Sequence, residues 1–273
     1  MKHAFVTGWP ISHSKSPVLH GYWLEKYNIQ GSYDAVGVQP EAFPDFLNQL
    51  PESRFVGGNI TLPHKEVAYS SIANRDQAAE MIGAINTVWI EDGQLKGSNT
   101  DAYGFSANLD DFAGSWRDGK IATVIGAGGA SRAIIFALIE AGYQQIRIAN
   151  RTLSRAEGLM QHFGDKCSAH GWPEIEELCH DTDLLVNTSS VGMAGDDTTS
   201  LPNLDALPEN ALVTDIVYTP LVTPILKRAD DKGLKTVDGL GMLLHQAVPG
   251  FEKWFGVKPE VTTALREKIL EAK

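Results

Sequence analysis

The sequence predicts an α/β protein of two domains. Short apolar runs alternate with segments of helical periodicity along the chain, which is typical of strand-helix-strand units around a largely parallel sheet. The length of 273 residues suits two domains of about 150 residues each. From residue 120 the apolar runs become compact and regular, as expected for buried parallel strands of a second sheet.

The first hundred residues contain apolar runs bounded by turn-forming residues. They predict strands at 3–8, 33–38, 56–61, 84–90 and 94–96, and helices at 17–27, 42–49, 65–71 and 77–82. Pro17 suits the first turn of its helix, where no N–H is needed. The tripeptide Glu91-Asp92-Gly93 predicts a tight hairpin turn between the last two strands.

The rest of the chain predicts strands at 121–125, 145–149, 184–187, 212–216 and 235–237, with a helix at 131–141. The tail from 241 to 272 is expected to be helical, with Pro249 and Pro259 dividing it into at least two pieces. We expect one domain of residues 1–102 together with 240–273, to which the final helices return, and a second domain of residues 103–239.

The composition excludes several classes of protein. No apolar run approaches the roughly 18 residues needed to cross a bilayer, and the first apolar stretch is too short for a signal-peptide core. We therefore expect a cytoplasmic protein, and its two cysteines, Cys167 and Cys179, are too few for a disulfide framework. His162, His170 and His180 match no zinc spacing, so we expect no metal.

The charge argues against nucleic acid as a partner. There are 34 acidic and 23 basic residues, the net charge is −11, and no run of Lys or Arg indicates a basic face. An anionic ligand must therefore be held by local groups.

A glycine-rich loop follows the strand expected at 121–125. Gly126 and Gly128 fit a Rossmann dinucleotide-binding turn, in which the first glycine permits the tight turn and the second lets the backbone approach the pyrophosphate. Ser131 occupies the third position, where glycine or alanine is usual. The alternative is an ordinary turn from strand to helix.

The end of the following strand indicates which dinucleotide would bind. Asn150-Arg151-Thr152 and Arg155 stand where an NAD site would place an acidic residue on the ribose hydroxyls. Guanidinium groups bind phosphate through a planar fork, so NADP with its 2′-phosphate is favoured over NAD. The alternative is a solvated helix start capped by Thr152.

Polar clusters also mark the first half of the chain. Asn59, Thr61 and Lys65 offer an amide, a hydroxyl and an ammonium near the end of a strand, and Asn99-Thr100-Asp101 follows later. Two further hydroxyls, in the Ser14-x-Ser16 pair, precede the helix at Pro17. They either bind an anionic group at this helix start, or Ser16 only caps the helix.

Together these motifs resemble the shikimate dehydrogenase family. The resemblance spans nearly the whole chain in order, through the Ser14 to Pro17, Asn59 to Lys65, Ala84 to Thr87, Gly97 to Phe105, Gly126, Asn150 and Asp238 to Gln246 segments. It implies the reversible NADP-dependent reduction of 3-dehydroshikimate to shikimate in the pathway to chorismate and aromatic amino acids. Ala102 departs from the glycine of many relatives, but the Asp-x-x-Gly spacing is kept.

The resemblance also implies roles for individual residues. Lys65 and Asp101 would be the catalytic pair. The substrate would be bound by Ser14, Ser16, Asn59, Thr61, Lys65, Asn86, Asp101, Tyr218 and Gln246. NADP would be bound by Gly126, Ala127, Gly128, Gly129, Ala130, Ser131, Asn150, Arg151, Thr152, Arg155, Thr188, Ser189, Ile216 and Gly239.

Lys65 suits two tasks, because its ammonium can polarise a carbonyl and donate a proton, and its neutral amine can accept one. Whether it acts as acid and base or only through its charge stays open here. The alternatives are a quinate/shikimate dehydrogenase that uses NAD and a non-catalytic NADP-binding protein of the same fold. We expect a small-molecule substrate, a monomer or homodimer, and hinge closure of the two domains on ligand binding.

Overall fold

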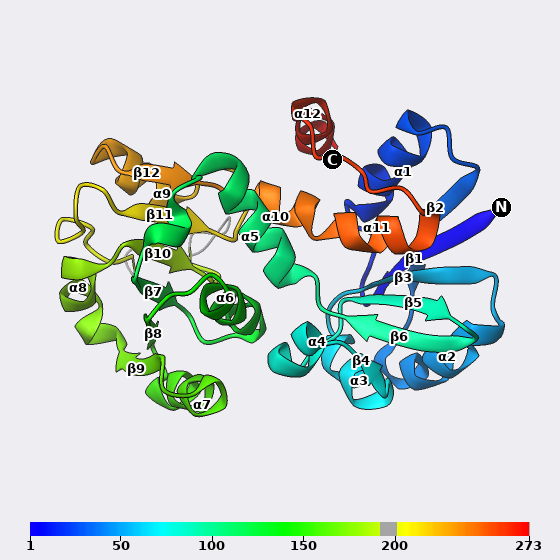
Figure 1. Cartoon of the computed structure of the whole chain (residues 1–273), viewed down its shortest axis with the longest axis horizontal. Helices are drawn as coiled ribbons and strands as arrows, with labels where there is room; N and C mark the ends of the chain where they lie inside the picture. The colour runs from blue at the N-terminus through cyan, green and yellow to red at the C-terminus, as the bar shows by residue number, and fades with distance from the viewer. Residues whose placement is uncertain (192–200, 273) are drawn as a thin grey trace. The chain divides into compact units, whose positions relative to one another are not determined.

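The computed structural model describes residues 1–191 and 201–272 (Figure 1). The chain forms two compact units, Met1–Thr100 with Leu244–Lys273, and Asp101–Leu243. Each unit contains one six-stranded sheet. The α/β class is confirmed. Across the described ranges, every helix is too short or too polar to span a bilayer.

The first unit has a mixed sheet with the strand order β2-β1-β3-β5-β6-β4. Its strands are β1 (Lys2–Gly8), β2 (Gly31–Gly37), β3 (Phe55–Ile60), β4 (Asn74–Arg75), β5 (Thr87–Glu91) and β6 (Gln94–Ser98). The pairs β1–β2, β1–β3 and β4–β6 are parallel, whereas β3–β5 and β5–β6 are antiparallel. The hairpin turn between β5 and β6 is confirmed, because Glu91 pairs with Gln94 and both Asp92 (φ 53°) and Gly93 (φ 73°) are left-handed.

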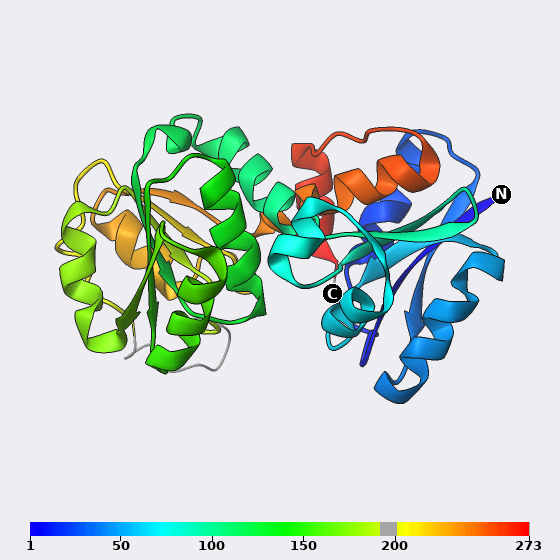
Figure 2. The same ribbon diagram turned by 60° about the horizontal axis from the view of Figure 1, so that its bottom comes forward.

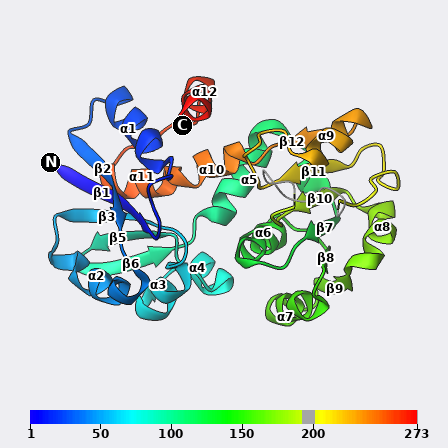
Figure 3. The ribbon, with the colours of Figure 1, turned by 180° about the vertical axis from the view of Figure 1, so that it is seen from behind.

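Helices lie on both faces of this sheet. The helices of this unit are α1 (Ser16–Lys26), α2 (Phe43–Gln49), α3 (Lys65–Ser71), α4 (Gln77–Ile82), α11 (Ala247–Phe255) and α12 (Thr263–Glu271). Figure 3 shows α1 and α11 on one face and α2 and α3 on the other. Phe5 and Ile60 pack against α2 and α3 in one buried cluster. On the opposite face Trp254 of α11 donates its Nε1 hydrogen to the Val88 carbonyl at 2.8 Å.

The second unit has a wholly parallel sheet in the order β12-β11-β10-β7-β8-β9 (Figure 2). Its strands are β7 (Ile121–Ile125), β8 (Gln145–Asn150), β9 (Cys167–Gly171), β10 (Leu184–Asn187), β11 (Leu212–Asp215) and β12 (Lys235–Val237). Its helices are α5 (Asp101–Phe112), α6 (Gly129–Glu140), α7 (Leu153–Phe163), α8 (Ile175–Leu178) and α9 (Pro224–Asp231), and α10 (Leu240–His245) crosses the second unit boundary. This strand order is that of a Rossmann fold, in which two halves wind outward from β7 and β10.

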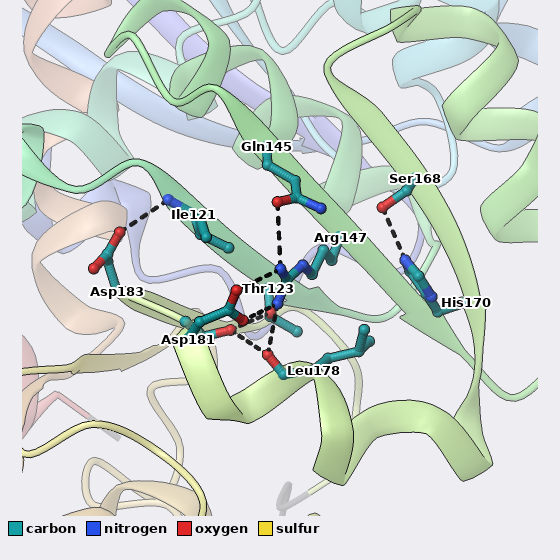
Figure 4. Close-up of polar contacts among 10 residues, drawn as sticks. Ile121, Thr123, Gln145, Arg147, Ser168, His170, Leu178, Asp181 and Asp183 are labelled. Carbon is teal, nitrogen blue, oxygen red and sulfur yellow. Dashed lines mark hydrogen bonds and ion pairs between the residues drawn. The ribbon is translucent and has the colours of Figure 1, made fainter.

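A polar network joins β7 and β8 to the segment that precedes β10 (Figure 4). Arg147 of β8 pairs with Asp181 and donates to the Leu178 carbonyl at 3.0 Å, and the Asp183 carboxylate accepts from the Ile121 amide at 2.9 Å. The Arg147 side chain holds the pKa of Asp181 below its usual value. These contacts anchor the segment before β10 to the first strands of the sheet.

Several expected boundaries were wrong. The strand expected at 84–90 begins only at Thr87, and β4 and β9 were missed because neither has an apolar run. Pro249 does not divide the tail, since it lies in the first turn of α11, where its missing N–H breaks no helical bond. The break falls at Gln246, whereas Pro259 lies between α11 and α12 as expected.

Candidate active site

The cofactor residues predicted from sequence follow the ends of neighbouring parallel strands in the second unit. Ile125 pairs with Ala149 and with Asn187, and Asn187 pairs with Asp215. Because all four strands run the same way, the residues after them lie at one edge of the sheet. This is the edge at which open α/β sheets bind their ligands.

Gly126 makes the turn out of β7. Its φ is 103°, and a Cβ there would lie 2.9 Å from Thr188 Oγ1, so both conformation and space require glycine. Gly128 is the N-cap of α6, and Gly128, Gly129 and Ala130 are exposed. The N-terminus of a long helix is therefore open to a pyrophosphate.

Ser131 stabilises this loop through hydrogen bonds to its backbone. Its buried Oγ donates to the Gly126 carbonyl at 2.9 Å, accepts from the Gly128 amide at 3.0 Å and lies 2.7 Å from Thr188 Oγ1. Thr188 in turn donates to the Ile125 carbonyl at 2.7 Å. The serine that departs from the usual fingerprint thus joins two of the predicted cofactor segments, a role that a glycine could not fill.

The basic residues after β8 are both exposed. Arg151 and Arg155 flank the start of α7, and Asn150 donates from Nδ2 to the Thr152 carbonyl at 2.8 Å. Thr152 is at the N-cap but makes no side-chain capping bond, so the helix-capping alternative loses its main support. Two accessible guanidiniums at this position suit a 2′-phosphate.

Asp215, at the end of β11, was missed by the sequence reasoning. It is fully buried and accepts hydrogen bonds from Asn187 Nδ2 at 3.0 Å, Thr223 Oγ1 at 2.7 Å and the Val217 amide at 2.9 Å. Burial raises the pKa of this carboxyl. An acidic residue at the end of an apolar strand was the available signal, because a buried charge requires several donors.

Ile216 and Gly239, both predicted to bind NADP, and Tyr218, predicted to bind the substrate, follow the ends of β11 and β12. A Cβ on Gly239 would lie 2.5 Å from the Ile216 carbonyl carbon, so glycine permits this close backbone contact. Tyr218 is half-buried, and burial raises the pKa of its hydroxyl. Ser189 donates from Oγ to Asn187 Oδ1 at 2.7 Å, which connects the Ser189 segment to the Asp215 network.

The substrate residues predicted in the first unit centre on two buried asparagines. Asn59 donates from Nδ2 to the Asn86 carbonyl at 3.2 Å and to Thr87 Oγ1 at 3.1 Å. Asn86 Oδ1 accepts from the Thr100 amide at 2.9 Å and from Thr87 Oγ1 at 2.8 Å. The structure therefore brings Asn59 and Asn86 together and fixes both side chains.

Lys65 adjoins the same network. It is half-buried at the first turn of α3, and its carbonyl accepts from the Ile85 amide at 3.0 Å. The preceding His64 is buried, bonded to the Val38 carbonyl at 2.7 Å and stacked on Phe43 at 4.1 Å, so it anchors the helix start. Asp101 is the next residue after Thr100, although it begins the second unit.

The two serines stand before and inside α1. Ser16 is the first residue of the helix and Lys15 is the N-cap, so Ser16 does not cap it. Ser14 Oγ instead accepts from the Ser16 amide at 3.3 Å. Both serines and Thr61 are half-buried, as is Gln246 just before α11.

The arrangement offers no metal site among the residues that the structure describes, where no three His, Cys, Asp or Glu side chains form a ligand group. Its chemistry would come from Lys65, carboxylates, amides and hydroxyls. Such groups can bind a polyhydroxylated acid and move a proton.

Comparison with known proteins identifies three matching family profiles. They are the shikimate dehydrogenase substrate binding domain at residues 6–88, shikimate / quinate 5-dehydrogenase at 111–242 and the shikimate 5′-dehydrogenase C-terminal domain at 239–267. An NADP-dependent shikimate dehydrogenase of Mesorhizobium japonicum is 56% identical over 270 residues, which cover 98% of this chain and 96% of that protein.

Solved structures are similar over nearly the full length. Shikimate 5-dehydrogenase of Thermus thermophilus, in complex with NADP(H) and shikimate, has 37% identity, a TM-score of 0.84 and 99% coverage of both chains. Quinate dehydrogenase of Corynebacterium glutamicum, in complex with NAD, has 27% identity, a TM-score of 0.90 and 99% coverage of both chains. Given these matches and the arrangement of the site residues, this chain belongs to the shikimate dehydrogenase family.

Proposed function

We propose that this protein catalyses the reversible, NADPH-dependent reduction of 3-dehydroshikimate to shikimate on the way to chorismate and the aromatic amino acids. One observation carries the proposal. Lys65 and Thr100 both form hydrogen bonds with the Ile85-Asn86 segment. The Lys65 carbonyl binds the Ile85 amide, and Asn86 Oδ1 binds the Thr100 amide. Lys65 and the residue before Asp101 therefore both adjoin a buried asparagine.

The two domains divide the work in this proposal. Residues 1–102 with 240–273 bind the substrate, and residues 103–239 bind NADP. The boundaries of the compact units, after Thr100 and after Leu243, lie close to these limits. The Rossmann strand order supports the assignment of NADP to the second part.

The hydroxyls of Ser14 and Ser16 in the substrate domain bind the substrate carboxylate, and Tyr218, from residues 103–239, assists them. The ring hydroxyls are held by Asn59, Thr61, Asn86, Asp101 and Gln246. Support comes from the burial and fixed orientation of Asn59 and Asn86, which leave little freedom to lose when substrate binds.

In the cofactor domain, the 126–131 loop binds the pyrophosphate and Arg151 and Arg155 bind the 2′-phosphate, with Asn150 and Thr152 beside them. Thr188, Ser189, Ile216 and Gly239 line the remainder of the cofactor. The exposure of both arginines and the absence of an acidic residue at 150–152 support NADP over NAD.

When bound, NADPH supplies the hydride. Lys65 polarises the substrate carbonyl through its ammonium and donates the proton that completes the new hydroxyl. In the reverse direction its neutral amine accepts that proton. Asp101 forms the catalytic pair with Lys65 and orients a ring hydroxyl of the substrate.

The deciding experiment compares steady-state rates for four combinations of shikimate or quinate with NADP or NAD. The highest kcat/KM is expected with shikimate and NADP. A preference for quinate and NAD would favour a quinate dehydrogenase, and no turnover with any pair would favour a non-catalytic protein of the same fold.

We further propose that the protein is cytoplasmic and is a monomer or homodimer. The two buried, unpaired cysteines suit the reducing cytoplasm.

A further inference from the structure

Tyr33 is a buried tyrosine in β2 that has no role in the proposed mechanism. Its side chain is 7% exposed, and β1 separates β2 from β3 in the sheet. The side chain extends across β1, and its hydroxyl donates to Asn59 Oδ1 of β3 at 2.6 Å. The ring stacks on the imidazole of His20 at 3.9 Å. Tyr33 thus contacts a proposed substrate residue inside the protein.

The contacts of Asn59 fix which way its carboxamide faces. A backbone carbonyl can only accept, so the bond to the Asn86 oxygen at 3.2 Å identifies the nitrogen of the carboxamide. The second amide hydrogen points to Thr87 Oγ1 at 3.1 Å. Both donors are therefore used inside the protein, and Oδ1 faces Tyr33.

We propose that Tyr33 is a positioning residue for substrate binding, which holds the Asn59 carboxamide so that Oδ1 accepts a hydrogen bond from a ring hydroxyl. A carbonyl oxygen has two lone pairs, and the Tyr33 hydroxyl takes one of them. The inference rests on the proposed function, because it assumes that Asn59 binds the substrate.

The surroundings of Tyr33 keep it in place. His20 is fully buried, and desolvation lowers its pKa to about 3. It is a neutral ring at physiological pH, held against Tyr33 by Phe251 and Trp254 of α11. Burial also raises the pKa of the Tyr33 hydroxyl, so this hydroxyl stays a donor.

Loss of the Tyr33 hydroxyl should therefore disturb substrate binding through Asn59 and leave the NADP residues of the other unit unchanged.

The test is a double-mutant cycle with Tyr33→Phe and Asn59→Ala, assayed with shikimate and NADP. Tyr33→Phe is expected to raise the KM for shikimate about three- to tenfold, the range for one lost hydrogen bond, with an unchanged KM for NADP. In the Asn59→Ala background, Tyr33→Phe should have no further effect, because its only route to the substrate is gone.

The matched control is Tyr143→Phe. Tyr143 is also buried, and its hydroxyl donates to the Trp116 carbonyl at 2.6 Å in the second unit. The Tyr143→Phe substitution should lower the Tm without changing the KM for shikimate. If Tyr33→Phe cannot be isolated folded, Thr87→Val carries the test, because it releases the same carboxamide from its other side and should also raise the KM for shikimate.

An unchanged KM for shikimate in Tyr33→Phe, or an equal rise in the presence and absence of Asn59, would overturn the inference while the proposed function stands. If only Thr87→Val can be measured, an unchanged KM has the same meaning. A wild-type protein that is inactive with shikimate and NADP would refute the proposed function, and the role of Tyr33 with it.

Discussion

Asn187 and Asp215 end two adjacent strands of the Rossmann sheet and are joined by a hydrogen bond of 3.0 Å between Nδ2 and the buried carboxylate. Asn187 Oδ1 holds Ser189, and the carboxylate holds the Val217 amide. One bond therefore connects two segments proposed to line NADP. A disturbance at Asp215 is transmitted to both of them.

We predict that Asp215→Asn raises the KM for NADP about tenfold. The new NH2 group must face either Asn187 and Thr223, which share one carboxylate oxygen, or the Val217 amide, and all three already donate. The KM for shikimate should change little. Initial rates over a range of both substrates measure this. Asp183→Asn is the control, since Asp183 accepts two backbone amides at the start of the strands. Equal effects of the two variants would contradict the assigned role of Asp215.

Lys65→Ala is expected to lower kcat by about 100-fold or more, the range for a lost acid–base group, with a much smaller effect on the KM for shikimate. Lys227→Ala is the control, since Lys227 is an exposed surface residue paired with Asp231. Steady-state kinetics distinguish the two. A Lys65→Ala enzyme with wild-type turnover would remove Lys65 from the mechanism.

Replacement of Arg151 and Arg155 by alanine is expected to lower kcat/KM with NADPH at least tenfold and to leave the value with NADH nearly unchanged. The reason is that only NADPH carries the 2′-phosphate that a guanidinium fork binds. The ratio of the two kcat/KM values is the measurement. A parallel loss with both cofactors would mean that the arginines serve the fold and not the phosphate.

The ion pair between Arg147 and Asp181 predicts a pH dependence of stability. The folded-state pKa of Asp181 lies below its usual value of 3.8, so its stabilisation is complete above that value and is lost as the pH falls through the folded pKa. Wild type should exceed Asp181→Asn in Tm near neutral pH. The difference should shrink below about pH 4 and in high salt, because Asp181 is largely exposed. A difference that persists at pH 2 would point to another cause.

Much of the fold followed from local pattern. The expected ranges of α3, α4, β7, β10 and β12 match the structure residue for residue. Strand β9 was not predicted, because its sequence lacks a continuous apolar run. The segment 167–171 has only two small apolar residues, Cys167 and Ala169, and it becomes a strand by pairing with β8.

The site divides in the same way. Residues with a recognisable spacing, such as those around Gly126 and Lys65, could be selected from the sequence. Tyr33 and His20 could not, because their significance comes from partners 26 and 231 positions away in the chain, Asn59 and Phe251. No local pattern records such contacts.

The return of the C-terminal helices has a consequence for synthesis. Trp23 donates to the Glu260 carbonyl, Trp254 to Val88, and Lys15 to Ile269, so the first-emerging part of the chain is closed by the last. During synthesis the Rossmann sheet can be complete before α11 has emerged from the ribosome. Until then, the face of the first unit's sheet that α11 covers has exposed apolar side chains. That interval is when a nascent chain of this design most needs a chaperone.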